Sequence, residues 1–155
     1  MIVIIDYNLS NLNCVLSAVK YLGFEAKITN DLKYIKSASK LILPGVGAFP
    51  DAIKNLKKLN LFDVLNQKVL IEKIPFLGIC LGAQLICKSS EEFELKEGLN
   101  WVNAHVKRLT TKNNSIRIPH TGWNDIVISK KKSLLLEGFS NEENLFYFNH
   151  SYVIV

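Results

Sequence analysis

The sequence predicts an α/β fold in which a mainly parallel open sheet is flanked by helices on both faces, with antiparallel strands in the C-terminal part. The first run, MIVIID, is almost entirely β-branched and apolar, which is typical of a strand buried on both faces of a parallel sheet. Strand-like and helix-like runs alternate as far as residue 88, which indicates βαβ units. After Gly98, short strand-like runs follow one another, separated by turns rich in Asn, Gly and Lys.

In the parallel part we expect four strands, each followed by a helix. The first helix has apolar residues at helical spacing, as at Leu12, Val15 and Val19, and Gly23 supplies its C-terminal stop. The expected strands span residues 1–6, 24–29, 40–45 and 74–79. The expected helices span residues 11–23, 30–38, 51–73 with a break near Asn60, and 82–88. Further strands are expected within residues 99–109, 115–119, 125–129 and 144–155.

The composition indicates a single globular domain over residues 1–155. The chain is 48% hydrophobic and 21% charged, which excludes an intrinsically disordered protein. No apolar run approaches the roughly 20 residues that a membrane-spanning helix needs. The opening MIVIIDYN has neither the basic start nor the cleavage site of a signal peptide. We therefore expect a cytoplasmic protein without a membrane partner.

The cysteines and the net charge exclude other kinds of site. Cys14, Cys80 and Cys87 are odd in number and lack paired spacing, which argues against a disulfide framework and against a structural zinc site. We therefore expect no metal. The net charge is +5, but the lysines are scattered without interleaved aromatics, so no nucleic-acid partner is expected. A basic rim that faces a phosphorylated substrate or an acidic partner stays open.

The stretch GICLG, residues 78–82, carries the strongest chemical signal. It places Cys80 between two glycines where a strand meets a helix, the pattern of a nucleophile elbow, in which small neighbours prevent collisions. The turn presents the thiol at the C-terminal edge of the sheet, where helix N–H groups favour a thiolate and an oxyanion. The competing interpretation is a buried structural cysteine, which we expect instead for Cys14 and for Cys87 on the following helix.

Five segments, in order along nearly the whole chain, resemble one family. Residues 78–84, GICLGAQ, resemble the active-site turn of class I glutamine amidotransferases. IIDYNLSNL, LILPGVGAF, PHTGWND and FYFNHSY resemble segments of one branch, the glutaminase subunit of imidazole glycerol phosphate synthase in histidine biosynthesis. The resemblance implies a flavodoxin-like fold, L-glutamine as substrate and no cofactor. It also implies a heterodimer with a (β/α)8 synthase (cyclase) subunit that uses the ammonia.

The resemblance also implies roles for individual residues. Cys80 would attack the carboxamide carbon of glutamine and form a glutamyl thioester. The backbone N–H of Leu81 would be the first oxyanion donor, and an N–H at Val46 or Gly47 would complete the oxyanion hole once partner binding orders that loop. By chemistry alone, this PGVG loop could be an ordinary turn and Gln84 an exposed helix residue. The residues that the resemblance assigns to glutamine binding are Gly45, Gly47, Gln84, His150, Ser151 and Tyr152.

A partner interface is implied at Asn11, Asn13, Trp123 and Tyr147. Trp123 would be an aromatic anchor on a loop, and the alternative is a tryptophan in the core. The alternative for Asn11 is helix capping, and for Asn13 it is a solvated helix position.

The chain departs from the family pattern at two places. The turn after the first strand reads DYNLSN, where the family has Asp-Tyr-Gly-x-Gly-Asn; Asn8 readily adopts a left-handed conformation, but Ser10 does so less readily. The chain also has no His-Pro-Glu segment, from which the family takes its triad base. We expect the domain to be C-terminally incomplete, and we do not expect His105, His120 or His150 to replace the base.

Other functions stay open on the sequence alone. The ammonia acceptor could be a sugar nucleotide that is aminated by a different partner. Without the triad His and Glu, the chain could be a catalytically inactive interaction module. A general cysteine hydrolase with the same elbow is a further alternative, and Gln84 and PHTGWND argue against it.

Overall fold

The structure is a computed structural model that describes residues 1–110, 117–128, 134–139 and 144–155. It divides into two compact units, one of residues 1–107 with 154–155 and the other of residues 108–153. The organisation of residues 1–155 as one domain stays a prediction. Across the described ranges, no helix combines the length and the hydrophobicity that crossing a membrane requires.

A four-stranded parallel sheet with the strand order β2-β1-β3-β4 forms the centre of the first unit. Its strands are β1 (Ile2–Ile5), β2 (Ala26–Thr29), β3 (Lys40–Gly45) and β4 (Phe76–Cys80). The connecting helices are α1 (Leu12–Tyr21), α2 (Leu32–Lys36), α3 (Phe49–Lys58), α4 (Leu61–Asn66) and the π-helical turn η1 (Gln67–Ile71). This arrangement confirms the α/β fold. The helix break near Asn60 is also confirmed, since a φ of 54° at Asn60 separates α3 from α4.

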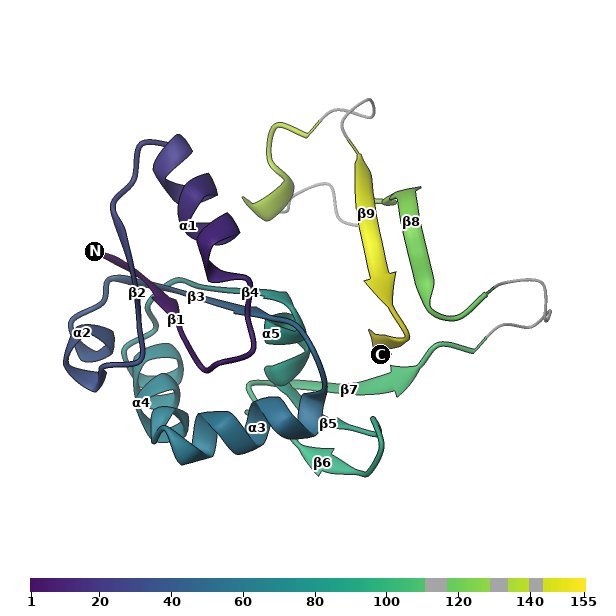
Figure 1. Cartoon of the computed structure of the whole chain (residues 1–155), viewed down its shortest axis with the longest axis horizontal. Coiled ribbons are helices and arrows are strands. Elements are labelled where there is room, and N and C mark those ends of the chain that lie inside the picture. Colours follow the sequence, from purple (N-terminus) through teal and green to yellow (C-terminus); the bar gives the residue numbers. More distant parts are fainter. Residues whose placement is uncertain (111–116, 129–133, 140–143) are drawn as a thin grey trace. The chain divides into compact units, whose positions relative to one another are not determined.

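Helices cover both faces of this sheet (Figure 1). The apolar stripe of α1 packs on one face against Ile4 and Ile42. Because side chains alternate along a strand, Val3, Ile5 and Leu43 point to the opposite face, and all three are fully buried. Figure 1 shows α3 and α4 on that side. Burial on both faces explains the continuous apolar run at the start of the sequence.

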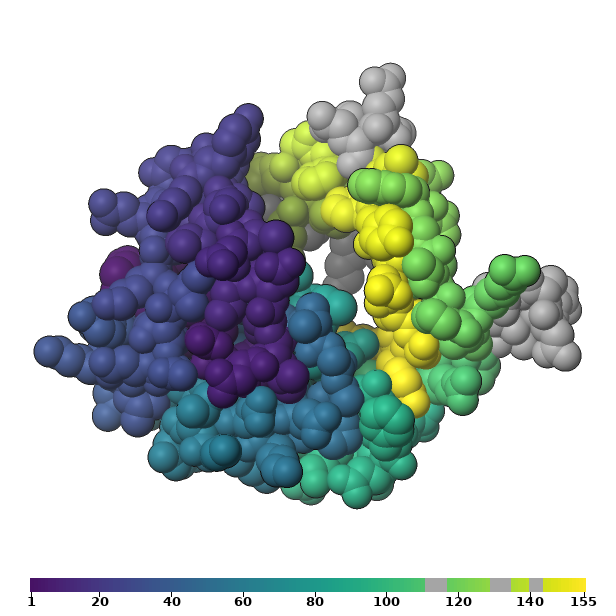
Figure 2. Space-filling view, in the orientation of Figure 1, coloured from purple at the N-terminus to yellow at the C-terminus, as the bar shows by residue number. Residues whose placement is uncertain are grey.

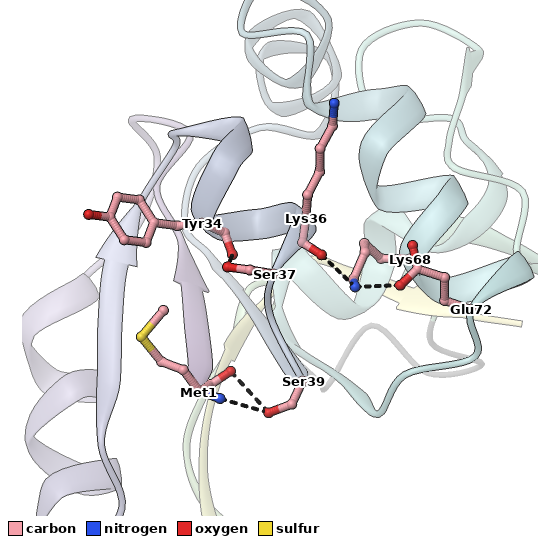
Figure 3. A network of polar contacts seen from close by, with 7 residues as sticks. All are labelled: Met1, Tyr34, Lys36, Ser37, Ser39, Lys68 and Glu72. Carbon is pink, nitrogen blue, oxygen red and sulfur yellow. Dashed lines mark hydrogen bonds and ion pairs between the residues drawn. The ribbon is translucent and has the colours of Figure 1, made fainter.

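Polar contacts fasten the sheet at the end where its strands begin (Figure 3). The amino group of Met1 donates to Ser39 Oγ at 2.9 Å, and that hydroxyl donates to the carbonyl oxygen of Met1 at 3.1 Å. Lys68 is buried, and its Nζ donates to the carbonyl oxygen of Lys36 at 2.8 Å and to Glu72 Oε2 at 2.5 Å. These contacts hold β1, α2 and η1 at the end of the sheet away from the C-terminal end of β4.

The helix after β4 is shorter than predicted. The expected helix at 82–88 is wrong beyond residue 85, because α5 spans Leu81–Leu85 and a strand, β5 (Cys87–Ser90), follows. The backbone N–H groups of Leu99 and Asn100 donate to the carbonyl oxygens of Leu85 and Cys87 at 2.8 and 3.1 Å. The segment at residues 99–100 thus takes carbonyl oxygens that a continued helix would use for its own hydrogen bonds. The second sheet has the order β10-β7-β5-β6, with β6 (Lys96–Glu97), β7 (Val102–Arg108) and β10 (Tyr152–Ile154).

The main element of the second unit is an antiparallel pair, β8 (His120–Asp125) and β9 (Leu145–His150), together with the 3₁₀ turn η2 (Leu134–Leu136). Figure 2 shows the atoms of β9, in yellow, along those of β8, in green. The sequence predicts strands within 115–119 and 125–129, but the strand forms over 120–125, where cross-strand pairs of bulky side chains favour pairing. Residues 115, 116 and 129 of those predictions lie outside the described residues.

Candidate active site at Cys80

Cys80 lies at a sharp corner between a strand and a helix. It is the last residue of β4 and immediately precedes α5. Its φ of 54° and ψ of −117° form a conformation that non-glycine residues rarely adopt. Its side chain is exposed. The turn therefore presents the sulfur at the C-terminal end of the parallel sheet, as expected of a nucleophile elbow.

The two glycines of GICLG make this corner sterically possible. A Cβ at Gly82 would collide with the carbonyl oxygen of Leu43 in β3. A Cβ at Gly78 would lie 2.7 Å from the Cα of Ala83 and 2.8 Å from its nitrogen. Both obstacles are backbone atoms, which cannot rotate away as a flexible side chain can. The close packing of β3, β4 and α5 around Cys80 therefore requires glycine at both positions.

The C-terminal end of β3 lies beside the thiol. Gly45 is the register partner of Cys80 in the parallel pair of β3 and β4. A Cβ at Gly45 would lie 2.9 Å from the Cβ of Leu81, so the backbone at residue 45 approaches α5 closely. Val46 and Gly47 follow and are exposed, with a φ of 96° at Gly47. The predicted oxyanion residues therefore lie at the same edge of the sheet as the thiol.

Two hydrogen bonds hold the PGVG loop, residues 44–47, against the turn that follows β1. The backbone N–H of Val46 donates to the carbonyl oxygen of Leu9 at 2.8 Å. The hydroxyl of Ser10 donates to the carbonyl oxygen of Pro44, also at 2.8 Å. The N–H of Val46 is thus directed at the turn after β1. It must leave Leu9 before it can donate to an oxyanion.

The sequence did not single out Tyr7, which lies beneath this loop. Its side chain is fully buried, and its hydroxyl has no hydrogen-bond partner among the described residues. A Cβ at Gly45 would contact that hydroxyl. Burial raises the pKa of the Tyr7 hydroxyl, the nearby Ser10 hydroxyl opposes that rise, and a thiolate at Cys80 would add to it. The phenol of Tyr7 is therefore a neutral neighbour of the thiol. The only sign of this residue in the sequence is an aromatic residue just after the first predicted strand.

The other two cysteines differ from what the sequence predicted. Cys87 is buried, as expected, but it lies in β5 and not on a helix. Burial raises the pKa of its thiol, which favours the unreactive protonated form. Cys14 is exposed on α1, so the prediction of a buried cysteine is wrong there. The physical reason is its position off the stripe of Leu12, Val15 and Leu16 that faces the sheet.

The remaining predicted residues of the first unit lie on or next to helices α1 and α5, and His105 lies in a strand. Gln84 is half-buried on α5, four residues after Cys80 and on the same side of that helix. Asn11 precedes α1 but makes no side-chain capping hydrogen bond, so the capping alternative is wrong. Asn13 is exposed in the first turn of α1. His105, in β7, contacts Ser89 through Nδ1 at 2.8 Å.

Trp123 and Tyr147 form an aromatic pair across β8 and β9. Their ring centroids are 5.5 Å apart with an interplanar angle of 72°. Trp123 is 68% exposed and Tyr147 57% exposed, so the alternative of a core tryptophan is wrong. The prediction of a loop at Trp123 is also wrong, because the residue belongs to a paired strand. Two large aromatic side chains therefore lie side by side on an exposed face of the second unit.

The segment His150-Ser151-Tyr152 joins β9 to β10. His150 is the cross-strand partner of His120, and the two rings are in contact, with His120 Nδ1 3.2 Å from His150 Nε2. The carbonyl oxygen of Ser151 accepts the N–H of Leu109 at 2.9 Å. These residues belong to the second unit, whereas Gly45, Gly47, Cys80 and Gln84 belong to the first.

Comparisons with known proteins identify the family of this chain. Residues 3–155 match the family "Glutamine amidotransferase class-I". A Methanococcus maripaludis protein named "Imidazole glycerol phosphate synthase subunit HisH 2" is 46% identical over 155 residues, which cover 100% of this chain and 75% of that protein. A Caldanaerobacter subterraneus protein named "Imidazole glycerol phosphate synthase subunit HisH" is 48% identical, and the match covers 99% of this chain and 73% of that protein.

Two solved structures share the fold. A crystal structure of a glutamine amidotransferase superposes with a TM-score of 0.64 at 23% identity and covers 79% of this chain. A putative peptidase E protein from Listeria monocytogenes superposes with a TM-score of 0.53 at 14% identity and covers 66% of this chain. Each match spans 62% of the solved chain. The family match over residues 3–155 and the relatives at 46% and 48% identity show that the chain belongs to the class I glutamine amidotransferases, among the relatives named imidazole glycerol phosphate synthase subunit HisH.

Proposed function

We propose that this chain is the glutaminase subunit of a cytoplasmic imidazole glycerol phosphate synthase. It hydrolyses L-glutamine and delivers ammonia to a (β/α)8 cyclase subunit, with which it forms a heterodimer. The observation that carries the proposal is the exposed Cys80 at its strained strand-to-helix corner, in a chain of the glutamine amidotransferase family. An exposed thiol at the N-terminus of a helix suits acyl transfer from an amide.

The proposed reaction takes place at the C-terminal edge of the parallel sheet, where the thiol of Cys80 lies. The sulfur of Cys80 attacks the carboxamide carbon of glutamine, and the carbonyl oxygen becomes an oxyanion that the N–H of Leu81 stabilises. The N–H of Val46 or Gly47 supplies a second donor. The carbon–nitrogen bond breaks, and the nitrogen leaves as ammonia with the proton that the thiol gives up. Water then hydrolyses the glutamyl thioester, which releases glutamate and regenerates the thiol. Glutamine itself is held by Gly45, Gly47, Gln84, His150, Ser151 and Tyr152.

Removal of the Ser10 hydroxyl should loosen the PGVG loop. The Ser10→Ala variant loses the hydrogen bond to Pro44, so the N–H of Val46 leaves Leu9 more often and becomes available to the oxyanion. One hydrogen bond contributes about 1 kcal/mol, so we expect the glutaminase rate without partner to rise about fivefold. Glutamate release in the absence of the cyclase measures this rise. Ser37→Ala is the control and should leave the rate unchanged. It removes a hydroxyl that donates to the backbone carbonyl oxygen of Tyr34 in α2. A lower rate in Ser10→Ala would contradict the role of this hydrogen bond.

The exposed aromatic pair suits a protein interface. Large aromatic side chains that lose their water on binding contribute much of the affinity at interfaces. We therefore place the cyclase contact at Trp123 and Tyr147 on β8 and β9, and at Asn11 and Asn13 at the start of α1.

Truncation of the tryptophan should weaken the complex. We expect Trp123→Ala to raise the dissociation constant for the cyclase about 30-fold, because a hot-spot aromatic contributes about 2 kcal/mol. Calorimetric titration of the cyclase measures the change. Tyr21→Ala is the matched control, since Tyr21 is 92% exposed at the far end of α1 and lies outside the proposed contact. Equal dissociation constants for wild type and Trp123→Ala would remove Trp123 from the interface.

One experiment separates the proposed function from its alternatives. The protein is mixed with a cyclase subunit and glutamine, and both complex formation and glutamate release are measured. A complex that releases glutamate supports the proposal. A complex without glutamate release supports the non-catalytic interaction module. Glutamate release that only a sugar-nucleotide-aminating partner stimulates would identify the other acceptor.

A further inference from the structure

We propose that His120 is a positioning residue for glutamine binding. It acts through His150 and fixes the backbone of residues 151–152, which the proposed function assigns to glutamine binding. The inference rests on that proposed function. It adds His120 and Asn124 to the residues on which the site depends, and neither was assigned a role by the sequence.

The structure shows a continuous chain of polar contacts that ends on this backbone. Asn124 Nδ2 lies 3.4 Å from His120 Nε2. His120 Nδ1 lies 3.2 Å from His150 Nε2. His150 Nδ1 lies 2.9 Å from the carbonyl oxygen of Tyr152. Because residues 120 and 150 are register partners in β8 and β9, the pairing of the two strands brings the two rings together.

The last acceptor in this series of polar contacts, the carbonyl oxygen of Tyr152, determines the direction of each hydrogen bond when both rings are neutral. A carbonyl oxygen only accepts, so His150 Nδ1 must carry the hydrogen that it donates to Tyr152. A neutral His150 then has a bare Nε2, which accepts, and His120 must donate from Nδ1. A neutral His120 in turn has a bare Nε2, which accepts from the amide of Asn124. When both rings are neutral, both are therefore Nδ1–H tautomers, and the donor at Asn124 and the acceptor at Tyr152 require the same assignment.

Packing holds the first ring of the relay in place. The ring of His120 stacks on Phe148 with a centroid distance of 4.8 Å and an interplanar angle of 20°. It meets His150 edge-on, at 5.2 Å and 70°. His120 is thus fixed by stacking, and the hydrogen bond that it donates fixes the rotation of the His150 ring.

The expected consequence is an effect on glutamine binding more than on bond cleavage. Without the donor at residue 120, the ring of His150 can rotate, and Tyr152 loses a defined hydrogen bond to its carbonyl. The segment that the proposed function assigns to glutamine binding becomes less ordered. Cys80 lies in a different part of the chain, and the turn between β4 and α5 that carries its thiol is unaffected. The loss of glutamine affinity should therefore raise KM and leave kcat nearly unchanged.

Two substitutions at the same residue test the relay in the complex with the cyclase. His120→Phe keeps the stacked ring and removes the donor, and we expect KM for glutamine to rise about fivefold, with kcat within twofold of wild type. His120→Asn retains an N–H donor near the position of Nδ1 and should restore most of the wild-type KM. Thr121→Val is the matched control. It removes the hydrogen bond from Thr121 Oγ1 to Asn149 Oδ1, 3.2 Å long, in the adjacent pair of the same strands, and KM should not change.

A second readout does not depend on activity. Long-range ¹H–¹⁵N NMR spectra at about pH 8 should show the Nδ1–H tautomer for both His120 and His150. An Nε2–H tautomer at either residue would overturn the relay. An active wild-type complex in which His120→Phe leaves KM unchanged would overturn the positioning role alone. A wild-type complex with no glutaminase activity would instead overturn the proposed function, and the role of His120 with it.

Discussion

Replacement of Cys80 by serine is expected to lower the glutaminase rate of the synthase complex by about 10³-fold or more. Serine has nearly the shape of cysteine, so the corner between β4 and α5 should persist. Its hydroxyl is a much weaker nucleophile than a thiolate at neutral pH. The rate of glutamate release measures the loss. The cyclase reaction supplied with ammonium salts should continue at its normal rate, since that reaction needs no thiol.

The exposed thiol of Cys14 provides the internal control. Cys14→Ser should retain full glutaminase activity, because Cys14 lies on α1 and not on the strand-to-helix turn that carries the proposed nucleophile. A chloroketone analogue of glutamine should label Cys80 first, and glutamine should protect that residue. Peptide mapping by mass spectrometry distinguishes the two thiols. A Cys80→Ser complex that keeps more than a tenth of the wild-type rate would rule out the thioester mechanism.

Replacement of Gly82 by alanine should unfold the corner that carries the thiol. The new Cβ collides with the carbonyl oxygen of Leu43, so β3 and α5 must move apart or the chain must lose this packing. Overpacking typically costs about 1–3 kcal/mol in free energy of unfolding, and a collision with backbone atoms lies at the upper end of that range. For a chain of this size we expect the melting temperature to fall by roughly 6–12 °C. Thermal unfolding followed by circular dichroism measures the shift.

Gly23→Ala separates this collision from backbone strain. Gly23 has a φ of 81°, but no heavy atom lies within 4 Å of an added Cβ, so only the cost of a positive φ remains. That cost is about 1 kcal/mol. The destabilisation in Gly82→Ala should therefore be clearly the larger of the two. Equal melting temperatures for the two variants would mean that α5 is not packed against β3 as the structure has it.

The sequence by itself determined the parallel sheet, its helices and the corner at Cys80. These features depend on local signals. A strand buried on both faces reads as a continuous apolar run, and a turn that must hold a nucleophile between two closely packed elements needs its glycines at set positions. The break at Asn60 could be predicted for the same reason, because asparagine tolerates a positive φ.

Only the tertiary structure decided features that depend on partners distant in sequence. α5 ends at residue 85 because the N–H of Leu99 takes the carbonyl of Leu85 and the N–H of Asn100 takes that of Cys87. No local pattern in GAQLICK reveals that competition. PHTGWND becomes a strand because β9 pairs with it, and the same pairing brings His120 to His150. The buried hydroxyl of Tyr7 and the hydrogen bond from Ser10 to Pro44 likewise arise from chain segments that meet only after folding. Local propensity is a weak preference that long-range backbone pairing overrides, so these parts of the site could not be read from the residues in order.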